Sequence, residues 1–217
     1  LGSATTIDTN ATDTDGDITI GAVTGTDINL TLVTTNTTGS ANHTFNGDIR
    51  LGSDGALSVT GDVVLGANVT VVGGGGVTFN NDINADNAAN NDRTLSLSSG
   101  QSSTITVTGN VGTSQALAGL TILQSNGTTF SANVDVSDSD AGTITLTDTS
   151  NDKHIRFEGN LTADNLTTVA QGYRLFLIGD TTTFTNAVSF QNADNVALGN
   201  EAGDSLTFNG GLTTTGV

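Results

Sequence analysis

The densest carboxylate cluster in the chain lies near its start, where Asp13, Asp15 and Asp17 alternate with other residues. Carboxylate oxygens at this spacing are ligands that calcium accepts. The order is not that of an EF-hand loop, because Gly16 stands two places early and no Glu closes the loop. We therefore expect either a calcium site at these three aspartates or a solvated acidic turn.

Two further acidic stretches resemble calcium loops less closely. Residues 199–206 carry one degenerate copy of the calcium-binding nonapeptide, and no tandem neighbour accompanies it. Asp135, Asp138 and Asp140 form another group, which we interpret as an acidic turn. The two histidines, His43 and His154, are far apart in the sequence. With so few other strong ligands, we expect no transition-metal site and no cofactor apart from the candidate calcium.

An enzyme that cleaves polysaccharides would need two carboxylic acids beside a groove. The sequence identifies no such pair, and the absence of Trp together with a single Tyr disfavours a cleft that stacks on sugars. Lys153, Arg156 and Arg174 are the cations of the second half, and we expect them to align and pair with Glu158. Such exposed pairs stabilise a protein little. We therefore expect no catalytic residue and no enzymatic activity.

The charge balance restricts the partners further. The formal net charge is −17, from 22 acidic and 5 basic residues. A chain with so few cations cannot replace the counterions of phosphate, so we expect no nucleic-acid binding and no binding to anionic lipid. No apolar run reaches the roughly 18 residues of a membrane span, which excludes insertion by a helix. The chain begins with Leu1, and we expect it to be a section of a longer protein.

The elements that would position these residues follow one recurrent six-residue pattern. The six positions are, in order, a polar residue, Phe or Val, a variable residue, a small or turn-forming residue, a residue that is usually Asn or Asp, and an aliphatic residue. Copies occupy residues 44–49, 58–63, 78–83, 106–111, 129–134, 156–161, 183–188 and 207–212. The Asn and Asp residues favour turns and bond to nearby backbone, so we expect them at corners. Repetition of this kind is typical of solenoids.

Alternation of apolar and polar residues predicts short strands with one buried face. We expect strands within residues 17–23, 28–32, 69–72, 94–98, 104–108, 117–122, 142–147, 173–179 and 196–199, and a loop over 84–92. No stretch has a helical period. We interpret the Thr-x-Thr runs at 104–108 and 143–147 as outward strand residues that do not share one repeated face.

From Val107 onward the pattern recurs about every 23 to 27 residues, the length of one solenoid coil with two or three strands. The sequence therefore predicts an all-β fold, a parallel β-solenoid that forms one unit over residues 1–217. We expect six phenylalanines to lie near one column of stacked side chains: Phe45, Phe79, Phe130, Phe157, Phe184 and Phe208. Phe45 and Val59 are too close for a full coil, so we expect one of them on a different face.

Residues 106–122 carry the phrase TVTGNVG followed by ALAGLTI, which resembles the repeats of filamentous-haemagglutinin-like bacterial adhesins. The resemblance implies a right-handed parallel β-helix, export, and a place at the bacterial cell surface. We therefore expect a structural or adhesive stalk segment. Its partners would be flanking repeats, other copies, or the surface of a host or neighbouring cell. The alternatives are an adhesin module stiffened by calcium and a β-helix enzyme that cleaves polysaccharides.

Overall fold

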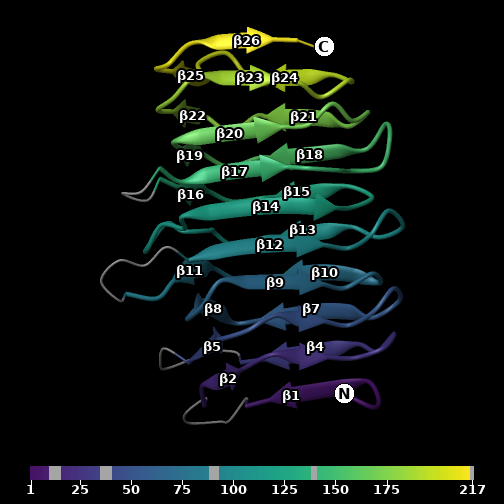
Figure 1. Ribbon diagram of the computed structural model, residues 1–217. Helices are drawn as coiled ribbons and strands as arrows, with labels where there is room; N and C mark the ends of the chain where they lie inside the picture. Colours follow the sequence, from purple (N-terminus) through teal and green to yellow (C-terminus); the bar gives the residue numbers. More distant parts are fainter. Residues whose placement is uncertain (10–15, 35–40, 88–92, 138–140, 216–217) are drawn as a thin grey trace.

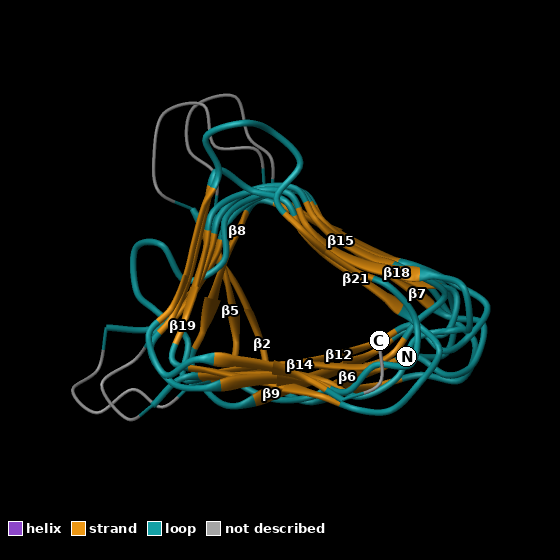
Figure 2. Cartoon of the chain, turned by 90° about the horizontal axis from the view of Figure 1, so that it is seen from above, coloured by secondary structure: helices purple, strands orange, loops and turns teal. Residues whose placement is uncertain are grey.

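The computed structural model describes residues 1–9, 16–34, 41–87, 93–137 and 141–215. The chain winds into a parallel β-solenoid in which successive coils stack from the N-terminus to the C-terminus (Figure 1). Viewed along the stack, each coil is a triangle with one sheet on each side (Figure 2). The predicted all-β, parallel β-solenoid fold is confirmed. The described residues form no helix, and thus none that could cross a membrane.

Two of the three sheets run the full length of the stack with nine described strands each. Sheet A contains β1 (Thr5–Asp8), β4 (Leu30–Val33), β7 (Ala56–Thr60), β10 (Gly76–Phe79), β13 (Ile105–Val107), β15 (Thr128–Phe130), β18 (His154–Phe157), β21 (Arg174–Leu177) and β24 (Val196–Leu198). Sheet C contains β3 (Val23–Thr24), β6 (Ile49–Arg50), β9 (Val69–Val72), β12 (Thr94–Ser98), β14 (Gly119–Gln124), β17 (Thr143–Leu146), β20 (Asn165–Thr168), β23 (Val188–Phe190) and β26 (Leu212–Thr214).

The third sheet, sheet B, consists of two four-stranded parts. The first contains β2 (Ile18–Ile20), β5 (Asn42–Phe45), β8 (Asp62–Leu65) and β11 (Ile83–Ala85). The second contains β16 (Val134–Val136), β19 (Leu161–Ala163), β22 (Thr181–Phe184) and β25 (Ser205–Phe208). Between them Val111 makes single bridges to Ile83 and Val134, so the backbone ladder continues through one residue where a strand is missing.

The period-two alternation explains why these segments form strands. In β12, Leu95 and Leu97 are fully buried, whereas the hydroxyl residues on either side of them are half-buried. Alternate side chains of a strand point to opposite faces, so every coil contributes aliphatic residues to one interior column. Full burial of a Leu or Val side chain contributes about 1.5 to 3 kcal/mol. A single coil cannot enclose its own apolar face, and its stability therefore depends on the neighbouring coils.

The expected phenylalanine column is divided between two sheets, and the prediction of one column was wrong. In sheet A, Val59, Phe79, Val107, Phe130 and Phe157 occupy the same register position in successive strands. The other three, Phe45, Phe184 and Phe208, lie in sheet B. The prediction that Phe45 and Val59 lie on different faces is confirmed. The recurrent pattern marks a corner between two sheets, and because each coil has several corners, the pattern does not count coils.

Most predicted strands differ from the observed ones by a few residues at their ends, and two predictions need a larger correction. The strand expected over 17–23 is divided into β2 and β3, because the chain turns from sheet B to sheet C at Gly21 and Ala22. The loop expected over 84–92 begins later, since Asn84 and Ala85 belong to β11. Residues 88–92 lie outside the described residues.

Candidate functional site

The corner between sheets A and B carries a ladder of Asn and Asp side chains. Each side chain accepts a hydrogen bond from the backbone N–H of its counterpart in the next coil. The backbone N–H of Asn110 donates to Asp82 Oδ1 at 2.7 Å, and that of Asn133 donates to Asn110 Oδ1 at 3.2 Å. Asn160 donates to Asn133 Oδ1 at 2.9 Å, and Thr181 to Asn160 Oδ1 at 3.0 Å. These bonds satisfy corner N–H groups that the strand ladders do not reach.

The same corner ladder includes one of the predicted calcium ligands. Asp17 Oδ1 accepts a hydrogen bond from Asn42 N at 2.9 Å, and further along Asp62 Oδ1 accepts one from Asp82 N at 3.2 Å. Asp13 and Asp15 lie outside the described residues. Within the described ranges no three His, Asp or Glu residues gather to hold a metal ion. Calcium at Asp13, Asp15 and Asp17 therefore stays a prediction, and Asp17 has a structural contact of its own.

The other two corners use the same chemistry. Between sheets B and C, Asp48 Oδ1 accepts a hydrogen bond from Thr70 N at 2.8 Å. This bond, with the guanidinium of Arg50, lowers the pKa of the Asp48 carboxyl. Between sheets C and A, Asp27 Oδ1 accepts hydrogen bonds from Asp54 N and Ser53 Oγ, both at 3.0 Å, and these lower its pKa. Both carboxyls therefore favour the ionised, hydrogen-bond-accepting form.

The carboxylates of the two other acidic groups accept hydrogen bonds from nearby residues of the same segment. Asp135 Oδ1 accepts hydrogen bonds from the backbone N–H and the hydroxyl of Ser137, two residues later. Asp135 itself is the middle residue of β16 and not part of the predicted acidic turn, while Asp138 and Asp140 lie outside the described residues. Asp204 Oδ2 accepts hydrogen bonds from Asn200 N at 2.7 Å and Glu201 N at 3.1 Å. Its carboxylate closes the turn in which it lies.

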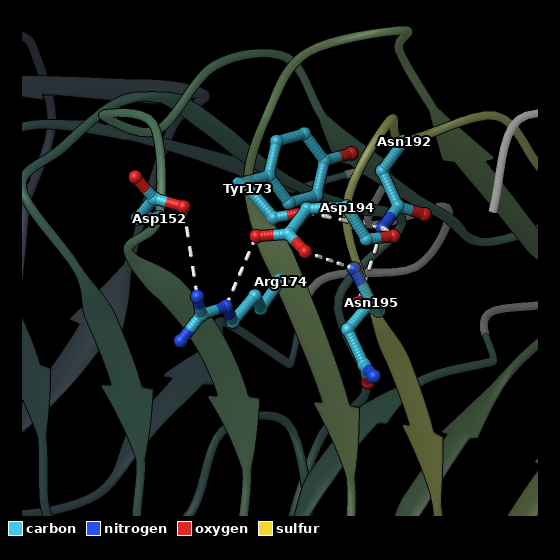
Figure 3. A network of polar contacts seen from close by, with 6 residues as sticks. All are labelled: Asp152, Tyr173, Arg174, Asn192, Asp194 and Asn195. Carbon is cyan, nitrogen blue, oxygen red and sulfur yellow. Dashed lines mark hydrogen bonds and ion pairs between the residues drawn. The ribbon is translucent and has the colours of Figure 1, made fainter.

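A buried polar network lies at the corner between sheets C and A in the last coils (Figure 3). Asn192 is fully buried, and its Nδ2 donates to the carbonyl oxygens of Tyr173 at 3.1 Å, Asp194 at 3.1 Å and Asn195 at 3.3 Å. Its Oδ1 has no hydrogen-bond partner within the described ranges of the chain. One amide group thus fixes the backbone of two consecutive coils at this corner.

Tyr173 stands directly beside this network and is also fully buried. Its hydroxyl donates to the carbonyl of Leu146 at 3.2 Å and accepts from Val169 N at 3.4 Å. Burial raises the pKa of the phenol to about 12. The side chain therefore stays neutral at all physiological pH values, and its role is structural.

Arg156 and Arg174 come from adjacent strands of sheet A, β18 and β21, but they do not share a register position, so the predicted alignment was wrong. His154 pairs in register with Arg174, and Arg156 with Phe176. The Arg156 guanidinium lies 5.2 Å from the centre of the Phe176 ring and 3.0 Å from Glu158, which confirms the predicted ion pair.

Arg174 bonds to Asp194 at 3.0 Å and lies 3.5 Å from Asp152 (Figure 3). Asp152 is exposed and Asp194 is half-buried, while the Arg174 side chain itself is 44% exposed, so these pairs contribute little stability.

His43 lies in the interior of sheet B and is fully inaccessible to solvent. Its Nε2 lies 2.9 Å from the carbonyl oxygen of Thr60, and its Nδ1 has no hydrogen-bond partner among the residues that the structure describes. Burial lowers the pKa of the imidazole, and the Thr60 contact and Asp62 oppose this effect only in part. The second histidine, His154, lies on sheet A, so the two do not form a common site.

Two hollows lie at the C-terminal end, where no further described coil covers the interior. One, of about 530 Å³, is lined by Phe190, Ala193, Asp194, Asn195, Val196, Leu198 and Thr214. The other, of about 460 Å³, is lined by Leu198, Gly199, Asn200, Glu201, Ala202, Asp204 and Leu206. Their walls are core residues and turn residues of the last coil. They lie where the next coil of a solenoid would stack.

The corner ladders were missed by sequence reasoning, which placed the Asn and Asp residues at corners but expected them to bond locally. The recurrence of these residues before the aliphatic position was the signal that could have revealed them. Comparison with known proteins adds no relative: no protein-family model, no curated protein and no solved structure matches the chain. What the protein does must therefore be argued from its own geometry.

Proposed function

We propose that this chain is a stalk or fibre segment that carries tension in an extracellular bacterial surface protein. The observation that carries the proposal is the corner ladder from Asp82 to Thr181, in which side chains connect every coil to the next one. These hydrogen bonds, like those of the parallel sheets, run along the stack. A force applied between the ends is therefore shared by strands and corners at each coil boundary.

The composition supports an exposed location. The chain contains no Cys and no Met, the two residues whose sulfur atoms peroxide oxidises most readily. Its net charge of −17 keeps separate rods soluble at high local concentration. Both features suit a polymer outside the cell, and the resemblance of residues 106–122 to secreted adhesin repeats agrees with them.

Single-molecule stretching tests whether the segment carries tension. The segment is placed between two identical globular marker domains and pulled from its ends. We expect extension in steps, each of which releases one coil, at forces that overlap those of the markers. A segment that extends fully before any marker unfolds would not carry tension, and this result would contradict the proposal.

A second measurement addresses the enzymatic alternative. In the described structure Asp27 and Asp48 are held ionised by backbone and side-chain donors, which suits acceptors of hydrogen bonds and not general acids. We expect no new reducing ends and no unsaturated products when the segment is incubated with acidic polysaccharides. Cleavage of any of them would establish an activity that the stalk proposal does not include.

A further inference from the structure

The outer face of sheet C carries a continuous row of hydroxyl residues. Seven consecutive strands of this sheet, from β9 to β26, place a Thr or Ser at the same register position: Thr70, Ser96, Thr121, Thr145, Thr167, Ser189 and Thr213. Thr145 comes from the Thr-x-Thr run at 143–147. The expectation that such runs share no repeated face was wrong, because the parallel register repeats one outward position in every coil. Thr106 of the other run is likewise in register with Thr78 and Thr129 of sheet A, where the hydroxyl row ends at the charged Arg156.

This face, called face C below, also lacks charged residues in its strands. None of the seven strands of sheet C from β9 to β26 contains Asp, Glu, Lys or Arg, although the chain carries a net charge of −17. Charged residues lie beyond the strand ends, as with Asp148 after β17 and Asp164 before β20. Leu123 of β14 adds an apolar side chain that is 36% exposed. Face C is one straight side of the triangular rod (Figure 2).

The hydroxyls in the middle of face C can bond to a partner. Within the described part of the chain, the hydroxyls of Ser96, Thr121 and Thr145 make no hydrogen bond to another protein group. Each of these half-buried residues also carries a methyl or methylene group beside its hydroxyl. The face can therefore form both hydrogen bonds and apolar contacts with a matching flat surface.

We propose that face C binds face C of a second copy, so that two rods associate side by side. The partner follows from charge. Two chains of −17 repel each other wherever their carboxylates approach within the screening length of about 8 Å at physiological salt. Two rods can approach each other closely along face C, because the strands of this long side contain no charged residues that would repel each other. A contact between identical faces is closed by a two-fold axis and repeats the same residues on both partners.

The area of face C sets the strength of this contact. Seven strands spaced about 4.8 Å apart and four residues long at about 3.3 Å each cover roughly 450 Å² per copy. The pair would bury roughly 900 Å² in total, just below the about 1,000 Å² that a stable interface needs. Pairing of this segment is therefore weak and depends on concentration, and it strengthens with every coil that a longer rod adds.

Sedimentation over a range of protein concentrations tests the pairing. We expect a monomer–dimer equilibrium for the unmodified segment, and Thr121→Glu to raise its dissociation constant at least tenfold because two buried carboxylates would face an uncharged surface. Thr106→Glu is the matched control. Thr106 is also half-buried in the outer row of its strand but lies in sheet A, so this variant should change the dissociation constant less than twofold.

Circular dichroism establishes that each variant is folded, and Thr145→Glu on the same row serves as a second variant if Thr121→Glu is not. An unmodified segment that stays monomeric at every concentration would overturn the proposal. Equal weakening by the face C and sheet A variants would also overturn it. The resistance to tension is measured separately by stretching single molecules, so pairing and the stalk function can fail independently.

Discussion

Asp82 accepts two hydrogen bonds from Asn110 of the next coil, one from the backbone N–H at 2.7 Å and one from the side-chain Nδ2 at 3.1 Å. Asn110 then accepts a hydrogen bond from Asn133 in the following coil. Adjacent coils are therefore joined at a corner by side chains as well as along the sheets by backbone. The corner also fixes the register, because each acceptor lies opposite one N–H group.

Removing one ladder side chain should destabilise the stack measurably. In Asn133→Ala, the N–H of Asn160 loses its acceptor, and because this bond is exposed we expect the free energy of unfolding to fall by about 0.5 to 1.5 kcal/mol. Asn133→Asp keeps an oxygen at the same place and should cost less than half as much. Chemical denaturation of the two variants measures this difference. Equal losses in both would mean that the acceptor oxygen is not what stabilises the corner.

The interruption of sheet B depends on Gly112. Its φ of +74° lies in the left-handed region, and a Cβ there would lie 2.0 Å from the carbonyl oxygen of Asp135. Because both the backbone conformation and the space exclude a side chain, we expect Gly112→Ala to lower the free energy of unfolding by more than about 2 kcal/mol. Thermal or chemical unfolding measures the loss.

Gly21→Ala is the control for this experiment, since nothing lies within 4 Å of the position that a methyl group would take at Gly21 and its φ is not left-handed. Its effect should stay within about 0.5 kcal/mol. A folded Gly112→Ala variant with the stability of Gly21→Ala would show that the chain can pass this point in another conformation.

Sequence reasoning predicted the strands and the parallel stack because the alternation in segments such as 94–98 reports directly which side chains face inward. It was right only in part on the number of residues per coil, since the steps from Val107 to Phe130 and to Phe157 fit the predicted 23 to 27 residues and the next steps are shorter. Val77 pairs with Ile105, whereas Phe157 pairs with Leu177, so the step between coils changes with the loops at the corners. Loop length has little energetic cost and leaves no periodic signal.

The site was less accessible to sequence reasoning than the fold. A motif such as 129–134 shows that an Asn belongs at a corner, but an Asn at a turn can bond within its own turn or to another coil. Only the stacked register shows that Asn133 accepts from Asn160. The row on face C was missed for the same reason, since Thr121 and Thr145 come into one line only when the coil lengths are known.

Tyr173 reports on the last coils because it is the only tyrosine of the chain. With its pKa raised to about 12 by burial, the phenol should not ionise until pH approaches that value. In denaturant it should ionise near pH 10, the ordinary value for tyrosine. Near-ultraviolet absorbance of tyrosinate follows both titrations. A midpoint near 10 in the native protein would mean that the corner of Figure 3 is open to solvent.

Acidification should destabilise the rod through His43. Burial lowers the pKa of His43 in the folded state, so the unfolded chain, with a pKa near 6.5, binds the proton more tightly. The stability is therefore present above about pH 6.5 and is lost as the pH falls below it, by at most about 1.4 kcal/mol for each pH unit. Denaturation at a series of pH values from 8 to 5 measures this slope.

His43→Val should remove that part of the slope and make the protein more stable at pH 5 than the unmodified chain. The substitution suits its surroundings, because His43 pairs in register with Ile18 and Val63, whose side chains also face the interior. The carbonyl oxygen of Thr60 keeps a hydrogen bond from the N–H of Thr34 at 2.8 Å, so it still has a donor after the imidazole is removed.

His154→Gln is the necessary comparison for the pH series. Partial burial and the neighbouring Arg156 lower the pKa of His154 too, so it adds its own loss of stability on acidification. The two contributions should be separable, because the histidines lie on different sheets. In the double variant, the free energy of unfolding should hardly change with pH in this range, apart from the effect of the carboxylates. If His43→Val leaves the slope unchanged, His43 is reached by solvent and is protonated in the folded rod, and the coil around β5 must open without unfolding the stack.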